Sequence, residues 1–173
     1  MAEQHAVRFY VIGGPIYDTA ASQYRDDELR GMVHELGIQD RVRFVPFREN
    51  IEDVYRALDI VVHASSRPEP FGRTIAEAMA TGKPLVASRD SGAAELFVDG
   101  ADAIGTPARD PLALAEAIRG LILEPRRREV LGRAARAAAV ERFSRDRLAN
   151  GLFAIYRSTG CMEDTERTSV GQA

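Results

Sequence analysis

The sequence predicts an α/β fold in which a parallel β-sheet carries helices on both faces. Short apolar runs alternate with longer amphipathic segments, an order typical of parallel strands joined by right-handed crossover helices. Element boundaries are marked as well, because Gly82 and Pro84 suit a helix end while Asp110 and Pro111 suit a helix start. No internal repeat or low-complexity block in the sequence favours another architecture.

Composition and charge describe one ordinary globular domain. The 173 residues are 45% hydrophobic and 28% charged, and the net charge of -3 gives no bulk argument for nucleic-acid binding. The single cysteine, Cys161, excludes an internal disulfide and fits a reducing compartment, so we expect a cytoplasmic location. The three histidines are scattered and there is no cysteine pair, so we expect no metal site. We also expect neither a signal peptide nor a membrane span.

The first part of the chain is predicted to hold three strands and two helices. Residues 7–12 form an apolar run that ends in Gly13 and Gly14, as expected of a buried parallel strand that turns sharply at its carboxyl end. The elements that follow are a helix at 26–36 with Leu29, Met32, Val33 and Leu36 on one face, a strand at 42–47, a helix at 51–58 and a strand at 60–63. Because ligands of open α/β sheets gather at the carboxyl edge, Gly13 and Gly14 either contact a phosphate or simply form a tight turn. For His63, a packed strand-end residue is favoured over a proton carrier.

The second part continues the alternation. A helix is expected to begin near residues 72–74 and to end at Gly82, with Ile75, Ala78 and Met79 on its apolar face. Strands are predicted at 85–88 and 103–106, followed by helices at 111–123, 125–142 and 147–157. The buried side of the first of these three helices is predicted to consist of Leu112, Leu114, Ala117, Ile118 and Leu121. Residues 158–173 are polar, and we expect a disordered tail there.

The arginine-rich helix at 125–142 leaves two interpretations open. Its arginines could attract an anionic membrane, which would place the protein at the inner face of the membrane. Glu129 and Glu141 interleave with them, however, and this pattern favours a solvated helix face.

The loop before the central helix holds a carboxylate in an irregular backbone. Pro68 and Pro70 cannot sit inside a helix or a central strand, and each pushes the preceding residue toward extended geometry. Residues 67–71 are therefore predicted to form an irregular loop, and Glu69 is a loop carboxylate.

The helix after this loop is suited to bind phosphate. The first amides of a helix have no partner within it, and the helix dipole favours negative charge at that end. Gly72 would let a ligand approach the backbone, Thr74 offers a hydroxyl, and Arg73 adds a positive charge. Glu77 lies about one turn further on, and its carboxylate suits a pair of ribose hydroxyls.

The run from Glu69 to Glu77, Glu-Pro-Phe-Gly-Arg-Thr-Ile-Ala-Glu, resembles a known family motif. It is similar to the two glutamates separated by seven residues in retaining glycosyltransferases of the GT-B fold, in particular glycosyltransferase family 4 (group 1). The similarity extends over about residues 7–143 and includes the glycine turn after the first strand and the run from Gly82 to Ser88. The resemblance implies a Rossmann-like fold that forms the carboxy-terminal half of a GT-B protein.

That resemblance also implies a site for a nucleotide-diphosphate sugar, which is the donor substrate, and no cofactor. In such enzymes the first glutamate, here Glu69, lies beside the donor sugar and the reacting phosphate and has a catalytic role. The second glutamate, here Glu77, holds the ribose hydroxyls. The other residues implied in donor binding are Phe71, Gly72, Arg73 and Thr74 at the sugar and diphosphate, and Phe47 in the loop along the base.

The sequence departs from the family before Val7. Family members have an amino-terminal acceptor domain, and their donor domain opens with a strand and a loop whose arginine and lysine grip the diphosphate. We find neither upstream of Val7, so residues 1–157 are expected to form a donor-binding domain without its first strand and basic loop. We expect this chain alone to be inactive, because the leaving diphosphate would lack its main positive partners.

Other functions stay open at this point. Two carboxylates can also serve a retaining glycosidase, but Glu77 lies on a helix whose start suits phosphate, which disfavours that reading. A nucleotide-sugar epimerase shares the GT-B architecture. A non-catalytic module that binds a nucleotide sugar or a protein is the alternative from outside the enzymes.

Overall fold

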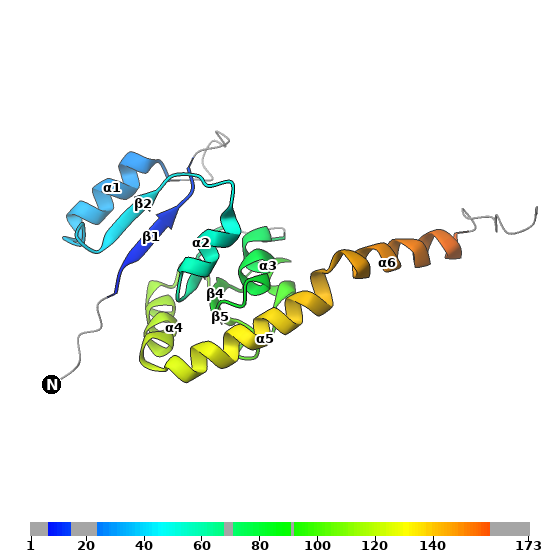
Figure 1. The fold of residues 1–173 in the computed structure, drawn as a ribbon. Helices are drawn as coiled ribbons and strands as arrows, with labels where there is room; N and C mark the ends of the chain where they lie inside the picture. Colours follow the sequence, from blue (N-terminus) through cyan, green and yellow to red (C-terminus); the bar gives the residue numbers. More distant parts are fainter. Residues whose placement is uncertain (1–6, 15–23, 68–70, 91, 160–173) are drawn as a thin grey trace, which may run out of the picture.

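The computed structural model describes residues 7–14, 24–67, 71–90 and 92–159, in which strands and helices alternate (Figure 1). The strands are β1 (Phe9–Ile12), β2 (Val42–Val45), β3 (Val61–His63), β4 (Leu85–Ser88) and β5 (Ile104–Thr106). The α-helices are α1 (Asp26–Glu35), α2 (Ile51–Ala57), α3 (Arg73–Ala80), α4 (Pro111–Leu123), α5 (Pro125–Phe143) and α6 (Arg145–Ser158), and a short 3-10 helix, η1 (Gly92–Leu96), lies between β4 and β5.

The strands are parallel but form two hydrogen-bonded sheets. β1 pairs with β2, beginning with Phe9 opposite Val42. β4 lies between β3 and β5, and its Val86 stands opposite both Val62 and Ile104. The predicted parallel α/β architecture is confirmed, with its hydrogen bonding divided between a two-stranded and a three-stranded sheet.

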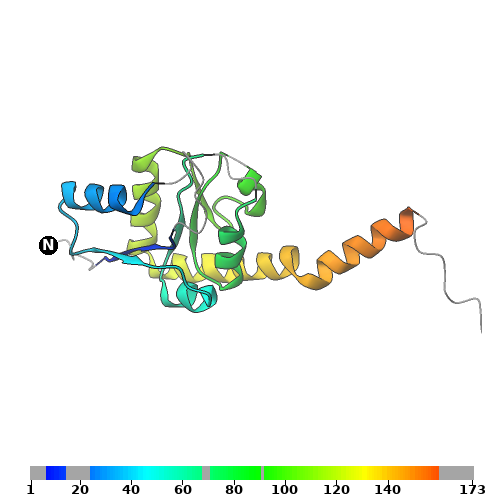
Figure 2. The ribbon, with the colours of Figure 1, turned by 90° about the horizontal axis from the view of Figure 1, so that it is seen from above.

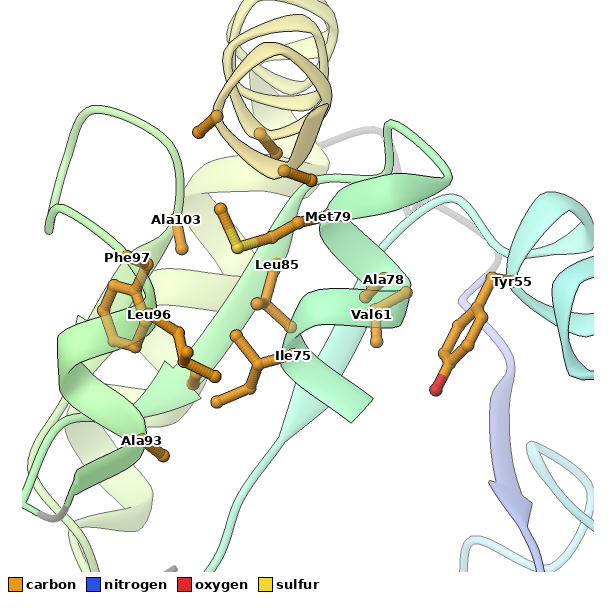
Figure 3. Close-up of a cluster of buried hydrophobic side chains, with 14 residues drawn as sticks. Tyr55, Val61, Ile75, Ala78, Met79, Leu85, Ala93, Leu96, Phe97 and Ala103 are labelled. Atoms are coloured by element: carbon orange, nitrogen blue, oxygen red, sulfur yellow. The ribbon is translucent and has the colours of Figure 1, made fainter. Parts of the chain in front are cut away.

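Helices cover both faces of the three-stranded sheet. Every residue of β4 is buried. Leu85 and Ala87 belong to a cluster that includes residues of α3 and α5 (Figure 3), whereas Val86 packs with Leu121 of α4 and Leu131 of α5. Because successive side chains of a strand point to opposite faces, α3 and α4 lie on opposite sides of this sheet.

The arginines of α5 bind other parts of the same fold. Arg128 donates hydrogen bonds to two carbonyls in the last turn of α4, at 2.6 and 2.9 Å, and Arg136 donates to the carbonyl of Ala80 at the end of α3. Arg142 pairs with the buried carboxylate of Asp102 at 3.1 Å. The contacts of Arg128 and Arg136 satisfy carbonyls that a helix end leaves without a partner, and Arg142 neutralises a buried charge, so these three arginines serve intramolecular contacts.

Most predicted elements lie within two residues of their observed bounds. β4 and α4 agree with the prediction at both ends. α4 begins as expected, because the Asp110 carboxylate accepts hydrogen bonds from the amides of Leu112 and Ala113 and proline occupies the first helical position. α6 extends from the end of α5 away from the body (Figures 1 and 2), and it contains no buried residue. The predicted tail lies, from residue 160 onward, outside the described residues.

The prediction that the first strand is buried was wrong. In β1, Phe9 and Tyr10 each keep 45% of their surface exposed and Val11 keeps 39%. β1 pairs with β2 alone among the described strands, and α1 beside this sheet has no buried residue. The apolar run therefore has the composition of a strand covered on both faces, but its side chains are exposed to solvent.

The apolar face of α1 is only partly buried, and the predicted buried side of α4 is wrong at one residue. On α1, Leu29 and Val33 are partly buried, but Met32 and Leu36 are exposed. On α4, Leu121 is fully buried while Leu112 is 77% exposed. Leu112 lies in the first turn, beyond the residues of this helix that pack against Val86.

Candidate functional site

The start of α3 requires a glycine for reasons that the fold itself supplies. Gly72 precedes the helix with a φ of 79°, a left-handed conformation that side chains other than glycine rarely adopt. A β-carbon at this position would lie 3.0 Å from the Ile75 side chain and 3.2 Å from the β-carbon of Ala93. Gly72 is therefore buried against α3 and η1, and its presence follows from conformation and packing.

The side chain of Glu77 lies over the first turn of α3. One of its oxygens, Oε2, accepts a hydrogen bond from the Tyr55 hydroxyl of α2 at 3.1 Å. The other, Oε1, is 3.4 Å from the guanidinium of Arg73, one helical turn earlier. Because helical side chains lean toward the amino terminus, this is the direction expected for Glu77. Its side chain is 34% exposed, so the carboxylate is half-buried and still reaches solvent.

Tyr55 has an environment that keeps its hydroxyl protonated. Only 5% of the residue is exposed, and it belongs to the apolar cluster shown in Figure 3. Burial raises the pKa of Tyr55 from 10.0 to about 12, and the negative charge of Glu77 and its hydrogen bond act in the same direction. A hydrogen bond with Thr74 acts in the opposite direction. Tyr55 is thus a donor toward Glu77 at any pH near neutrality.

The predicted donor-site residues at the start of α3 lie close together. Arg73 is highly exposed, Thr74 is half-buried beside Tyr55, and Phe71 is exposed. Glu69, the predicted catalytic residue, lies outside the described residues, which resume at residue 71. The first turn of α3 therefore gathers a hydroxyl, a guanidinium and a carboxylate beside helix amides.

The remaining predicted residues lie just after the carboxyl ends of β1 and β2. Gly13 follows β1 with a φ of 127°, and its amide donates to the carbonyl of Val45 at 3.0 Å. Gly13 and Gly14 are exposed, and a β-carbon on either would meet nothing within 4 Å. Phe47 follows β2 and is also exposed. These three residues follow strands of the two-stranded sheet, whereas the α3 group lies on a helix that packs against the three-stranded sheet.

A set of polar contacts at the carboxyl ends of β3, β4 and β5 was not predicted from the sequence. Ser88 donates to the carbonyl of Ser65 at 2.9 Å, and Arg109 donates to the carbonyl of Ser66 at 3.0 Å. A cavity at this edge is lined by these residues. Arg109 has a φ of 59°, which is unusual for a residue with a long side chain. The two hydrogen bonds hold Ser65 and Ser66, which precede residues 68–70. The sequence signal for these contacts was Ser88, a polar residue at the end of a predicted strand.

His63 ends β3 and is half-buried, and its Nδ1 is buried without a hydrogen-bond partner among the described residues. In the described part of the chain, no three histidine, cysteine, aspartate or glutamate side chains are placed to share a metal ion. None of the described helices combines the length and apolar character that a membrane span needs.

Comparisons with known sequences identify the family. The sequence model "Glycosyl transferases group 1" matches residues 1–138. A D-inositol 3-phosphate glycosyltransferase of Xylanimonas cellulosilytica is 35% identical over 152 residues, covering 87% of this chain and 35% of that protein. The lipopolysaccharide core biosynthesis mannosyltransferase LpsB of Rhizobium meliloti is 35% identical over 135 residues, covering 77% of this chain and 38% of that protein. The chain thus spans little more than a third of these relatives.

Solved structures agree with that assignment. Anabaena HepE in complex with UDP superposes with a TM-score of 0.81 at 32% identity, covering 88% of this chain and 41% of HepE. The carboxy-terminal domain of the group 1 family protein LpcC of Francisella tularensis superposes with a TM-score of 0.63 at 28% identity, covering 69% of this chain and 62% of that one. The Rossmann-like fold matches that of GT-B glycosyltransferases, and the chain belongs to the group 1 glycosyltransferases.

Proposed function

We propose that this chain is the donor-binding domain of a retaining, family 4 glycosyltransferase that moves a sugar from a nucleotide-diphosphate sugar to an acceptor. The observation that carries the proposal is the half-buried carboxylate of Glu77, held over the first turn of α3 by Tyr55. Support also comes from HepE, 32% identical over the shared region, which was solved with UDP and with UDP-glucose.

In the proposed complex, the diphosphate lies at the amino terminus of α3. Helix amides favour anions there, and Arg73 offers an exposed positive charge next to them. The Glu77 carboxylate would accept hydrogen bonds from the ribose hydroxyls, and a carboxylate is well suited to that role because both of its oxygens are acceptors. No metal or cofactor takes part in this proposal.

Around this centre, the remaining site residues take the roles that the family motif gives them. Glu69 would lie beside the donor sugar as the catalytic residue. Phe71, Gly72 and Thr74 would line the sugar and the diphosphate, while Phe47 would contact the base. Gly13 and Gly14 would let the phosphates approach the end of β1, where exposed glycines leave open space.

We further propose that a strand and a basic loop from outside residues 1–157 complete the domain. The observed orders, β1–β2 and β3–β4–β5, match the doubly wound order 3-2-1-4-5-6 if one strand lies between β1 and β3. The exposed apolar side chains of Phe9, Tyr10 and Val11 support this arrangement, because such a strand and its helix would cover them. Such a loop would supply positive charge that stabilises the leaving diphosphate.

A cytoplasmic location is the companion proposal, supported by the single cysteine. Contact with the inner face of a membrane has less support, because Arg127 and Arg133 of α5 pair with Glu124 and Glu129 at 3.4 and 3.9 Å. Such exposed pairs are typical of a solvated helix face.

Calorimetric titration of the chain with UDP, GDP and ADP tests the proposed function. We expect UDP to bind, and Glu77→Ala to weaken that binding by about 1–3 kcal/mol, the scale of lost hydrogen bonds to a charged group. Glu116→Ala is the matched control, because Glu116 is an exposed glutamate on α4. Equal binding by the wild type and Glu77→Ala would contradict the role of Glu77, and no binding of any of the three nucleotides would contradict the donor-site proposal.

A further inference from the structure

We propose that Tyr55 is a positioning residue that fixes the Glu77 carboxylate, so that its Oε1 faces the ribose hydroxyls of the donor. This inference rests on the proposed function, because it assigns to Tyr55 the orientation of the group that would bind the nucleotide.

The geometry of the contact constrains one oxygen of the carboxylate. Tyr55 lies in α2 and Glu77 in α3, 22 positions later, and the Tyr55 hydroxyl donates to Oε2 at 3.1 Å. Figure 3 shows the ring of Tyr55 at the margin of the buried cluster, beside Val61 and Ala78. A ring packed in this way has little freedom to move, so the hydroxyl is a fixed point against which the glutamate side chain is held.

The second oxygen has a partner of a different kind. Oε1 is 3.4 Å from Arg73, whose side chain is 86% exposed. A long contact to an exposed guanidinium contributes little free energy, and a ligand can replace it or share it at small cost. The two oxygens of Glu77 are therefore unequal, because Oε2 is held by a buried donor and Oε1 by a replaceable one.

Tyrosine suits this task better than other donors. Its ring fills an apolar site that is almost closed to solvent, and only its hydroxyl is polar. The raised pKa of Tyr55, about 12, follows first from burial, and it keeps the proton on the hydroxyl throughout the neutral range. Phenylalanine would preserve the packing and remove the donor alone, which makes Tyr55→Phe a clean probe.

The first arm of the test needs no ligand. The unfolding temperatures of the wild-type chain, Tyr55→Phe, Glu77→Ala and the double variant form a double-mutant cycle. We expect the double variant to unfold at nearly the temperature of the less stable single variant, because both changes remove the same contact. Losses that simply add would overturn the proposal, since they would mean that Tyr55 and Glu77 do not interact. Tyr156→Phe, an exposed tyrosine of α6, is the matched control.

The second arm compares UDP with its 2′,3′-dideoxy form, which lacks the ribose hydroxyls. The wild-type chain should prefer UDP, and Tyr55→Phe should reduce that preference about 3- to 10-fold, the size of one lost net hydrogen bond. A merely structural role would weaken both ligands equally, and that result would overturn the proposal. If the wild-type chain binds none of UDP, GDP and ADP, the proposed function and the positioning role fail together. If UDP binds but its preference survives in Tyr55→Phe, the positioning role fails alone.

Discussion

β1 and β4 are both short parallel strands of apolar sequence, yet they have opposite surroundings. All four residues of β4 are buried, whereas Phe9, Tyr10 and Val11 of β1 remain 39–45% exposed. β4 has a paired strand on each side and helices over both faces. β1 has one paired strand, and its neighbouring helix α1 has no buried residue. An apolar run therefore indicates that a strand is suited to burial, but whether the strand is buried depends on which other elements cover it.

The same contrast divides the candidate site. Glu77, Arg73 and Thr74 stand on the well-packed three-stranded part, while Gly13 and Phe47 follow the thinly covered strands. Packing contributes most of the stability of a domain. We therefore expect the α3 side of the site to be rigid and the β1–β2 side to open locally at lower free energy.

The largest expected effect comes from truncating a side chain in each part. Ile75→Ala should lower the free energy of unfolding by about 2–5 kcal/mol, because Ile75 is fully buried at the centre of the main cluster. Val11→Ala should cost less than about 1 kcal/mol, since part of the side chain is already in water. Urea unfolding measures both. Similar losses at the two positions would contradict the division of the molecule into two unequally packed parts.

A second pair of variants adds a methyl group instead of removing one. In Gly132→Ala, the new β-carbon would overlap the carbonyl oxygen of Gly82, where α5 crosses the end of α3. We expect a loss of about 1–3 kcal/mol from this overpacking. In Gly31→Ala the β-carbon would meet nothing within 4 Å, and alanine should stabilise α1 by up to about 1 kcal/mol. Thermal unfolding of the two variants should therefore shift in opposite directions, and shifts of the same sign would weaken the comparison.

A pH dependence is expected as well, and it belongs to the packed part. The pKa of Tyr55 is about 12 in the folded chain, against 10.0 for an unperturbed tyrosine. The folded state therefore keeps a proton that the unfolded state releases above pH 10. The stability contributed by the raised pKa is fully present below pH 10 and is lost between pH 10 and pH 12, by at most about 1.4 kcal/mol per pH unit.

Urea unfolding of the wild type and of Tyr55→Phe across that pH range checks this expectation. The difference in unfolding free energy between the two proteins should fall as the pH rises, because phenylalanine has no proton to lose. A constant difference would mean that the Tyr55 hydroxyl is not held in a buried, negatively charged surrounding.

Local signals explain how much of the fold could be predicted. Asp110 and Pro111 fix the start of α4 through bonds within a few residues, and Gly82 ends α3 in a left-handed conformation that suits glycine. Such signals do not depend on the rest of the chain. The exposure of Leu112 and of β1 does depend on the rest of the chain, because a side chain is covered only where another element extends over it. Local signals and periodicity therefore predicted where the elements lie, but they did not predict which of these surfaces would be covered.

The candidate site was predicted in the same uneven way. The helix that begins near Gly72 and the position of Glu77 in its second turn were predicted from the apolar periodicity and from glycine and proline positions, and both are confirmed. The binding roles of these residues stay predictions. Tyr55 was missed, because in the sequence it is one aromatic residue on a short helix and its partner lies 22 positions away. Arg109 was missed because no sequence rule favours arginine in a left-handed conformation.

The arginines of α5 have a consequence for how this part of the molecule comes apart. Arg136 binds the end of α3, Arg128 binds the end of α4, and Arg142 binds a carbonyl of η1. Detaching this single helix would leave carbonyls unsatisfied on three different elements at once. Fraying one of them in isolation is correspondingly unfavourable. Hydrogen exchange should therefore report α3, α4 and α5 as one cooperative opening unit, with the amide of Glu77 exchanging on the same timescale as those of α5.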